Sequence, residues 1–373
     1  MVITRYLVKE VSITLSALVF ILMLIFMSNQ FVQYLSRAAA GHLPGTLVIQ
    51  LLLLETPTML ALLLPLAFYL AVLIAYGRLY AEQEMTVLNA CGYSRTQLLQ
   101  VTMAMALVLS LIVGAVVLWA SPLISKQRDF LYTGGGASNL IQLIAPGRFQ
   151  TMASGKQVLY VEQKSRGARP QAEQIFLALR NDQATQQPGM MGWDLVTASH
   201  SYLTRDEATG EEFLVLEKGQ QYIGVPGEKN FRVIEFATYQ ARLPESKPYI
   251  RRVYQAMSTR QLWPPNNSDP AKAAELQWRL SAPLMMLVLG FIATPLSRVK
   301  PRQGKYAKLL PAIILYILYA NVLFMGRDWV AKGVIPTWLG LWWLHGLLIV
   351  LGAYWLWGES ITHWMRARWY GWH

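Results

Sequence analysis

The sequence predicts an α-helical transmembrane bundle of six spans, with an all-β domain inserted outside the membrane after the third span. Three observations predict this fold class. Six long apolar stretches are bounded by charged residues, and an interior segment of about 150 residues switches to short alternating patterns. Basic residues are also distributed unevenly between the two ends of the apolar stretches, which orients the bundle.

The spanning helices are expected where apolar stretches reach the roughly 20 residues needed to cross a bilayer. The stretches are residues 11–36, 46–76, 95–126, 280–297, 309–326 and 334–358. The first contains 26 uncharged residues. The apolar region of a signal peptide has only about 7–15, so we interpret this stretch as a retained helix. Prolines, which kink membrane helices, lie inside the second and fourth stretches: Pro57, Pro65, Pro283 and Pro295.

Lysine and arginine in the short loops decide the orientation of the bundle. Eleven lie on one side: Arg5, Lys9, Arg78, Arg95, Arg298, Lys300, Arg302, Lys305, Lys308, Arg366 and Arg368. Three lie on the other side: Arg37, Arg327 and Lys332. Because short cytoplasmic loops carry the basic excess, both termini are expected in the cytoplasm. The net charge of +12 is then explained by topology and anionic lipid, and nucleic-acid binding is not expected.

Alternating apolar and polar residues predict β-strands in the inserted domain. The clearest runs are residues 156–162, 174–179, 212–217 and 231–236. Glycine and proline turns separate them, as in a sandwich or a jelly roll. The chain has a single cysteine, Cys91, so no intramolecular disulfide can form and the domain must rely on its own core. The predicted domains are residues 1–125, 126–275 and 276–373.

The sequence contains no pattern of catalytic or metal-binding residues. A Walker A phosphate loop, a zinc-protease H-E-x-x-H motif and a G-x-S-x-G nucleophile motif are absent from the sequence. Its five histidines are scattered and fit no metal-ligand spacing. We therefore expect a non-catalytic chain with no metal ion and no cofactor of its own.

The loop between the second and third stretches predicts a short cytoplasmic helix over about residues 78–92. Carboxylates early in the helix favour its dipole, and Gly92 stands where a helix C-cap is expected. The candidate contact residues are Glu82, Glu84, Met85 and Leu88. One interpretation is a helix that docks into a groove of a cytosolic partner. The other is an ordinary helix lying at the membrane interface.

Glu55 is an acidic residue inside the second apolar stretch. Ionisable residues within spans usually face a cavity or a partner group. One interpretation is therefore a cavity-lining role. The other is a structural ion pair or a capping role, for which Arg37 at the outer end of the first stretch is the nearest candidate.

Short motifs lie along the chain in an order that resembles a known family. The motifs are Arg5-Tyr6-Leu7, Leu79-Tyr80, Ala90-Cys91-Gly92, Glu275-Leu276, Trp278-Arg279, Pro295-Leu296-Ser297 and Pro301-Arg302-Gln303-Gly304. Together with the layout of three helices, a β domain and three helices, they resemble the lipopolysaccharide export permeases of Gram-negative bacteria. This is the LptF/LptG family, and the resemblance is greater to its F-type branch.

The resemblance implies a β-jelly-roll domain in the periplasm, a multi-pass location in the cell inner membrane and a heterodimer with a G-type permease subunit. It also implies a cytosolic ATPase dimer that uses ATP, and periplasmic bridge proteins with a similar β-jelly roll. The cargo would be lipopolysaccharide. In the family the cytoplasmic helix couples the permease to the ATPase, and its acidic residue matches Glu84.

One departure from the family concerns the headgroup of the lipid. Family members carry basic residues near the outer end of the first span, whereas this chain has Gln30 and Gln33 there, with only Arg37 basic. Either the partner subunit supplies the charge or the headgroup differs. The candidate lipid-cavity or headgroup contacts are Gln30, Gln33, Arg37 and Glu55.

The function that the resemblance implies is extraction of lipopolysaccharide from the inner membrane and its transfer to a periplasmic bridge toward the outer membrane. Another lipid or lipoprotein export permease is an alternative, although known lipoprotein-releasing permeases have fewer spans. A membrane-bound enzyme is disfavoured because no catalytic constellation is visible. A membrane anchor that presents a β domain would need neither kinked helices nor an acidic cytoplasmic helix.

Overall fold

The computed structural model describes residues 2–39, 43, 45–133, 147, 149–152, 157–165, 171–181, 192–205, 212–225, 231–242, 254–263, 269–298 and 308–370. The chain divides into two compact units. The helical unit comprises residues 1–28, 54–125 and 249–373, and the β unit comprises residues 29–53 and 126–248. By their contacts, residues 249–275 therefore group with the helices. The predicted domain boundaries at residues 126 and 275 stay a prediction.

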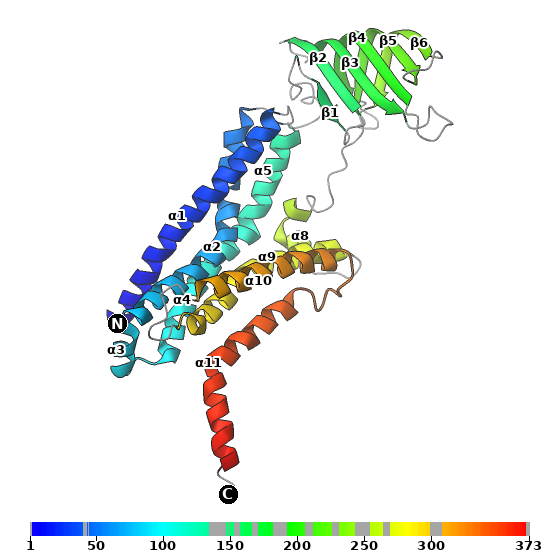
Figure 1. The fold of residues 1–373 in the computed structure, drawn as a ribbon. Coiled ribbons are helices and arrows are strands. Elements are labelled where there is room, and N and C mark those ends of the chain that lie inside the picture. Colours follow the sequence, from blue (N-terminus) through cyan, green and yellow to red (C-terminus); the bar gives the residue numbers. More distant parts are fainter. Residues whose placement is uncertain are drawn as a thin grey trace. The chain divides into compact units, whose positions relative to one another are not determined.

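Long helices make up most of the described chain. The helices, labelled in Figure 1 except for the short π-helical segment η1, are α1 (Val2–Ala39), α2 (Leu47–Ala81), α3 (Glu84–Ala90), α4 (Arg95–Ala115), η1 (Val116–Ala120), α5 (Ser121–Thr133), α8 (Thr259–Leu262), α9 (Pro270–Leu296), α10 (Leu309–Ala331) and α11 (Trp342–Tyr370). Among the described residues, five helices are long and apolar enough to cross a membrane: α1, α2, the continuous stretch Arg95–Leu131, α9 and α10. The prediction of a helical membrane bundle with an inserted β domain is thus confirmed.

The sixth predicted span differs from its expected position. Helix α11 begins at Trp342 and not at residue 334, because residues 334–341 form turns. Gly333 and Gly340 at these turns have left-handed backbone, with φ of 73° and 44°. The apolar part of the helix, Trp342–Trp357, is shorter than the other five candidates. A sixth span stays a prediction.

The core of the helical unit is built around α2 and α9. In the most apolar stretch of each of these helices, 61% and 56% of the residues are buried. Helix α9 contacts α4, α10 and α11. In the corresponding stretch of α1, only 6% of the residues are buried. Leu7 and Val11, near the start of α1, are nevertheless fully buried in the core that includes Phe68 and Met286. Helix α1 is therefore held in this unit by its N-terminal turns.

Local sequence sets where the third and fourth spans begin. Ser94 and Gln97 form a capping box at the start of α4. The Ser94 hydroxyl accepts the Gln97 backbone N–H at 3.2 Å, and the Gln97 side chain accepts the Ser94 backbone N–H at 2.8 Å. At the start of α9 the Asp269 carboxylate accepts the Lys272 backbone N–H at 3.1 Å, and a proline follows the cap.

The β unit contains one six-stranded antiparallel sheet whose strands follow one another in chain order. The strands are β1 (Gln150–Met152), β2 (Gln157–Ser165), β3 (Gln171–Asn181), β4 (Gly192–Arg205), β5 (Glu212–Gly224) and β6 (Phe231–Arg242). The four predicted runs lie in β2, β3, β5 and β6, except that residue 156 of the first run is outside the described residues. A jelly roll has two sheets, whereas the described strands form a single meander, so the jelly roll stays a prediction.

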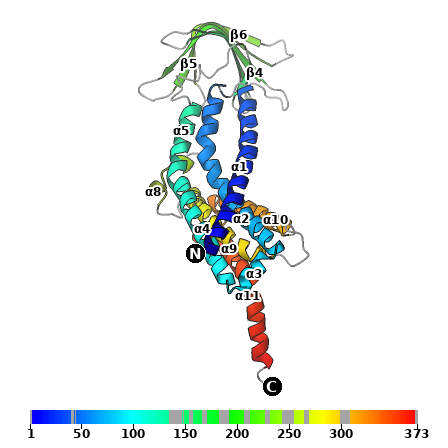
Figure 2. The ribbon, with the colours of Figure 1, turned by 90° about the vertical axis from the view of Figure 1, so that its left-hand side faces the viewer.

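The sheet is strongly curved, as Figure 2 shows. Gln174 in β3 and Lys218 in β5 have left-handed backbone, with φ of 49° and 53°. The next residue in β5, Gly219, has no room for a side chain, because a Cβ atom there would lie 2.1 Å from the Thr197 carbonyl oxygen. These positions bend the strands, and interruptions of this kind are how sheets acquire curvature.

Candidate coupling site and buried charge network

Helix α3 is a short helix in the loop after the second apolar stretch, where the sequence predicts one. The expected helix over residues 78–92 is divided in two, because α2 continues to Ala81 and α3 covers only Glu84–Ala90. Gln83 between them has left-handed backbone with φ of 63°. The helix ends in a Schellman motif: Gly92 has φ of 87°, and the backbone N–H groups of Gly92 and Tyr93 donate to Asn89 and Leu88 at 3.0 Å each.

The apolar residues of α3 face in different directions. Met85, a predicted contact residue, is only 2% exposed and packs in the core of the helical unit. Leu88 is half-buried against the same core. Val87 is 61% exposed. The large apolar side chain that α3 exposes to solvent is therefore Val87, while Met85 holds the helix onto the bundle.

Both predicted acidic residues of this site lie next to charged or polar groups of other helices. The Tyr6 hydroxyl of α1 donates to Glu84 Oε2 at 2.7 Å. Arg78 at the end of α2 donates to Glu10 of α1 and lies 3.7 Å from Glu82 Oε2. The Arg78 and Glu82 side chains are partly exposed, so their ion pair contributes little to stability. The hydrogen bond from Tyr6 to Glu84 fixes α3 against α1, and the contact between Arg78 and Glu10 fixes the last turn of α2 against α1.

The predicted lipid contacts fall in both units. Gln30, Gln33 and Arg37 lie on the part of α1 that belongs to the β unit, and Glu55 lies on α2 in the helical unit. Gln30 is half-buried, whereas Gln33 and Arg37 are exposed. The Arg37 guanidinium lies 5.9 Å from the centroid of the Tyr34 ring. Glu55 is 7% exposed. Their roles stay predictions.

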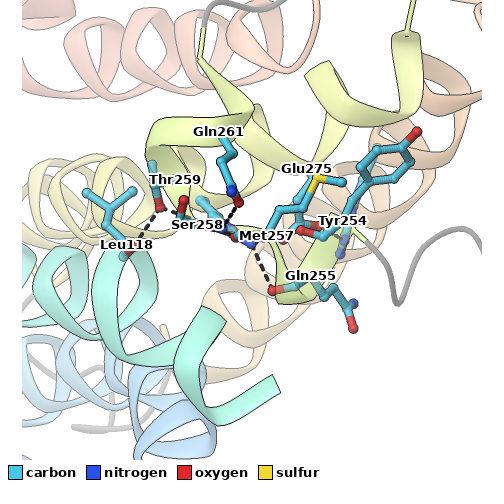
Figure 3. A network of polar contacts seen from close by, with 10 residues as sticks. Leu118, Tyr254, Gln255, Met257, Ser258, Thr259, Gln261 and Glu275 are labelled. Carbon is cyan, nitrogen blue, oxygen red and sulfur yellow. Dashed lines mark hydrogen bonds and ion pairs between the residues drawn. The ribbon is translucent and has the colours of Figure 1, made fainter. Parts of the chain in front are cut away.

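A buried charge network lies at the start of α9, where the chain returns from the β unit (Figure 3). Its members are Glu275 and Arg279 of α9 and Arg327 of α10, which are 5%, 2% and 6% exposed. The carboxylate of Glu275 accepts Arg279 Nε–H at 2.9 Å through one oxygen and Arg327 through the other. Buried charges are tolerated only when they are paired and hydrogen-bonded in this way.

All five N–H groups of Arg279 have an acceptor. Nε donates to Glu275, and Nη1 donates to the Met257 carbonyl at 3.0 Å and to the Thr259 hydroxyl at 3.1 Å. Nη2 donates to the carbonyl groups of Tyr254 and Gln255 at 3.1 and 2.9 Å. The guanidinium therefore fastens the linker over residues 254–259 to α9.

Thr259 continues this network to the third span. Its hydroxyl donates to the Leu118 carbonyl at 2.6 Å (Figure 3). Leu118 lies in η1, the π-helical turn between α4 and α5. On the other side of the linker, the Tyr254 hydroxyl donates to Asp269 at 2.7 Å, and this hydrogen bond raises the pKa of Tyr254. The linker is thus held at both of its ends.

The sequence pointed to this network only through the motifs Glu275-Leu276 and Trp278-Arg279. One available signal is the spacing of Glu275 and Arg279, which places opposite charges one helical turn apart. The acceptors from residues 254–259 and the partner Arg327, which is 52 residues from Glu275, are brought together only by the fold.

The β unit carries an apolar face and a groove. The buried residues of that face are Leu159, Val161, Ile175, Leu177, Val196, Ala198, Leu214 and Leu216. A groove of about 770 Å³ lies along the bend of the sheet, where Phe176 and Phe236 contribute to its walls beside Lys218. Among the described residues, no group of three or more His, Cys, Asp or Glu side chains is placed to hold a metal ion.

The fold and the site define a multi-spanning membrane protein that carries a β unit between two groups of helices and a short helix fixed to α1. The family model for the lipopolysaccharide export system permease LptF/LptG matches residues 5–358, and the chain belongs to this family. The predicted resemblance is thereby confirmed.

Individual relatives point to the F-type branch. The lipopolysaccharide export system permease proteins LptF of Escherichia coli strain K12, Escherichia coli O157:H7 and Shigella flexneri are each 32% identical to this chain over 355 residues. The matched region covers 94% of this chain and 93% of each relative. The similarity therefore includes both groups of helices and the β unit.

Proposed function

We propose that this chain is the F-type permease subunit that extracts lipopolysaccharide from the inner membrane and passes it to a periplasmic bridge. The observation that carries the proposal is the family match over residues 5–358, which spans the helices and the sheet together. In this proposal all six apolar stretches cross the membrane, both termini lie in the cytoplasm and the β unit lies in the periplasm as a jelly roll. The basic residues of the short loops support that orientation.

The apolar face of the sheet supports a role in receiving acyl chains. Exposing hydrocarbon to water costs about 0.8 kcal/mol per methylene, so release of a multiply acylated lipid into water would cost tens of kcal/mol. A curved sheet whose buried face consists of leucine, isoleucine, valine and alanine would remove most of that cost by giving the acyl chains apolar contacts in place of water. A bridge protein with a similar jelly roll would continue the apolar path by adding a strand at an edge of the sheet.

The energy for extraction would come from a cytosolic ATPase dimer, because the sequence has no nucleotide-binding loop of its own. The chain takes no cofactor in this proposal, and ATP is used by the partner. Helix α3 would dock on the ATPase through Glu84 and the exposed Val87. Met85 and Leu88 would keep the helix attached to the bundle, and Glu82 would support it through Arg78.

The lipid headgroup would meet polar residues of this chain and of a G-type partner subunit with which it forms a heterodimer. Gln30, Gln33 and Arg37 offer two amides and one guanidinium on the same helix. Phosphate binding usually relies on several cationic groups, so the partner subunit would supply the remaining charge. Glu55 would line a cavity within the bundle.

The test uses the chain purified with its partner subunit and ATPase and reconstituted into vesicles that contain lipopolysaccharide. We expect Glu84→Ala to lower lipid transfer per ATP hydrolysed while the complex still assembles in the membrane. The matched control is Glu173→Ala, because Glu173 is an exposed glutamate on β3. Wild-type transfer by the Glu84 variant would contradict the proposed docking. Absence of any ATP-dependent transfer by the wild-type complex would contradict the proposed function.

A further inference from the structure

The start of α1 is more deeply buried in the helical unit than the apolar stretch that follows it. Leu7 and Val11 are fully buried, one helical turn apart, in the core of the helical unit. Tyr6 and Glu10, also one turn apart, bring their polar groups to Glu84 and Arg78. Farther along, only 6% of the residues in the most apolar stretch of α1 are buried. Helix α1 is thus attached most closely at its cytoplasmic end. Leu15, Leu18 and Val19 are partly buried against the same core, and few residues of the apolar stretch are fully buried.

The connection between α2 and α3 leaves the direction of α3 to these side-chain contacts. Helix α2 ends at Ala81, and a turn with Gln83 in left-handed backbone precedes Glu84. Such a turn interrupts the backbone hydrogen bonds that would make two helices one rigid rod. The contacts that replace them are the burial of Met85 and the hydrogen bond from Tyr6 to Glu84 at 2.7 Å.

The hydrogen bond from Tyr6 orients the Glu84 carboxylate without neutralising it. A carboxylate accepts hydrogen bonds through both of its oxygens. Within the described part of the chain the bond from Tyr6 goes to Oε2, which leaves Oε1 as the oxygen for a cationic group of the ATPase. A hydroxyl is a neutral donor, so the negative charge that such a partner group would recognise is kept.

We propose that Tyr6 is a positioning residue for Glu84, and that α3 and the cytoplasmic end of α1 respond to the ATPase as one body. This inference rests on the proposed docking of α3 on the ATPase. It adds that the movement is delivered to α1, the helix whose apolar length is least enclosed in its own unit, through the Tyr6–Glu84 bond. Helix α2 is joined to α3 by the interrupted turn and to α1 by the Arg78–Glu10 ion pair.

The test is the variant Tyr6→Phe in the reconstituted complex, which removes one hydroxyl and keeps the ring. Lipopolysaccharide transferred per ATP hydrolysed should fall about tenfold, the ratio expected when one hydrogen bond to a charged group is lost. Thermal stability and the amount of assembled complex should stay at the wild-type level. The matched control is Tyr354→Phe, which removes the same hydroxyl from an exposed tyrosine on α11.

A double-mutant cycle separates positioning from a general structural role. If Tyr6 acts through Glu84, the double variant Tyr6→Phe with Glu84→Gln should transfer no less lipid per ATP than Glu84→Gln alone. Additive losses, or wild-type transfer by Tyr6→Phe, would overturn the inference. A wild-type complex without ATP-dependent transfer would instead overturn the proposed function, so the two failures can be told apart.

Discussion

Replacing Arg279 by lysine keeps the positive charge at the start of α9 but changes how many hydrogen bonds it can make. Arginine uses five N–H groups here, with acceptors on Glu275, Met257, Thr259, Tyr254 and Gln255. An ammonium group has three donors that leave one nitrogen atom. At least two of the five acceptors must therefore lose their partner.

The magnitude follows from the burial of the site. Arg279 is 2% exposed, so water does not readily replace the missing donors. Each unsatisfied buried acceptor costs about 1–3 kcal/mol, and two of them give a loss of about 2–6 kcal/mol in the free energy of unfolding. We also expect the linker over residues 254–259 to become more accessible to protease, because the guanidinium is what fastens it to α9.

The assay is thermal unfolding of the detergent-purified protein, followed by limited proteolysis of the linker. The matched control is Arg260→Lys, since Arg260 is an exposed arginine on the neighbouring helix α8, and exposed substitutions usually change stability by no more than about 0.5 kcal/mol. If Arg279→Lys unfolds at the same temperature as Arg260→Lys and its linker is equally protected, the reasoning about this network is refuted.

Three further substitutions test other features of the fold. Glu275→Gln removes the negative charge that pairs with two buried arginines and should cost about 3–5 kcal/mol; an unchanged unfolding midpoint would contradict this. Gly219→Ala places a Cβ atom 2.1 Å from a carbonyl oxygen and should make the β unit sensitive to limited proteolysis; a protease-resistant variant would show that the sheet can relax. Gly92→Ala puts a side chain at φ of 87° and should cost about 1–2 kcal/mol, measured as a lower unfolding midpoint; no loss would argue against the Schellman cap at the end of α3.

Much of the helical part could be predicted because a membrane span is a local property of about 20 residues. The start of α11 could not be predicted as well, because residues 334–341 are apolar enough to continue a span and yet form turns at glycines. The break between α2 and α3 was missed for a related reason. Gln83 has left-handed backbone, a conformation for which glutamine gives no sequence signal.

The strands show the same division between local and distant causes. Runs with clear alternation predicted β2, β3, β5 and β6, whereas β1 has only three residues and β4 loses its alternation. Val196 and Ala198 are buried and so is Ser201, which shifts the inward positions from even to odd numbers. The side-chain contacts of the candidate coupling site were harder to predict than the strands, because Tyr6 and Glu84 are 78 residues apart and no short motif joins them.

The most direct test of the proposed function is to purify the tagged chain from its native membrane in mild detergent and to identify what accompanies it by mass spectrometry. We predict recovery of a second multi-spanning permease subunit, a cytosolic ATPase and bound lipopolysaccharide. A chain that is recovered alone, lipid-free and stable would contradict the transport function and favour a membrane anchor that presents a β domain.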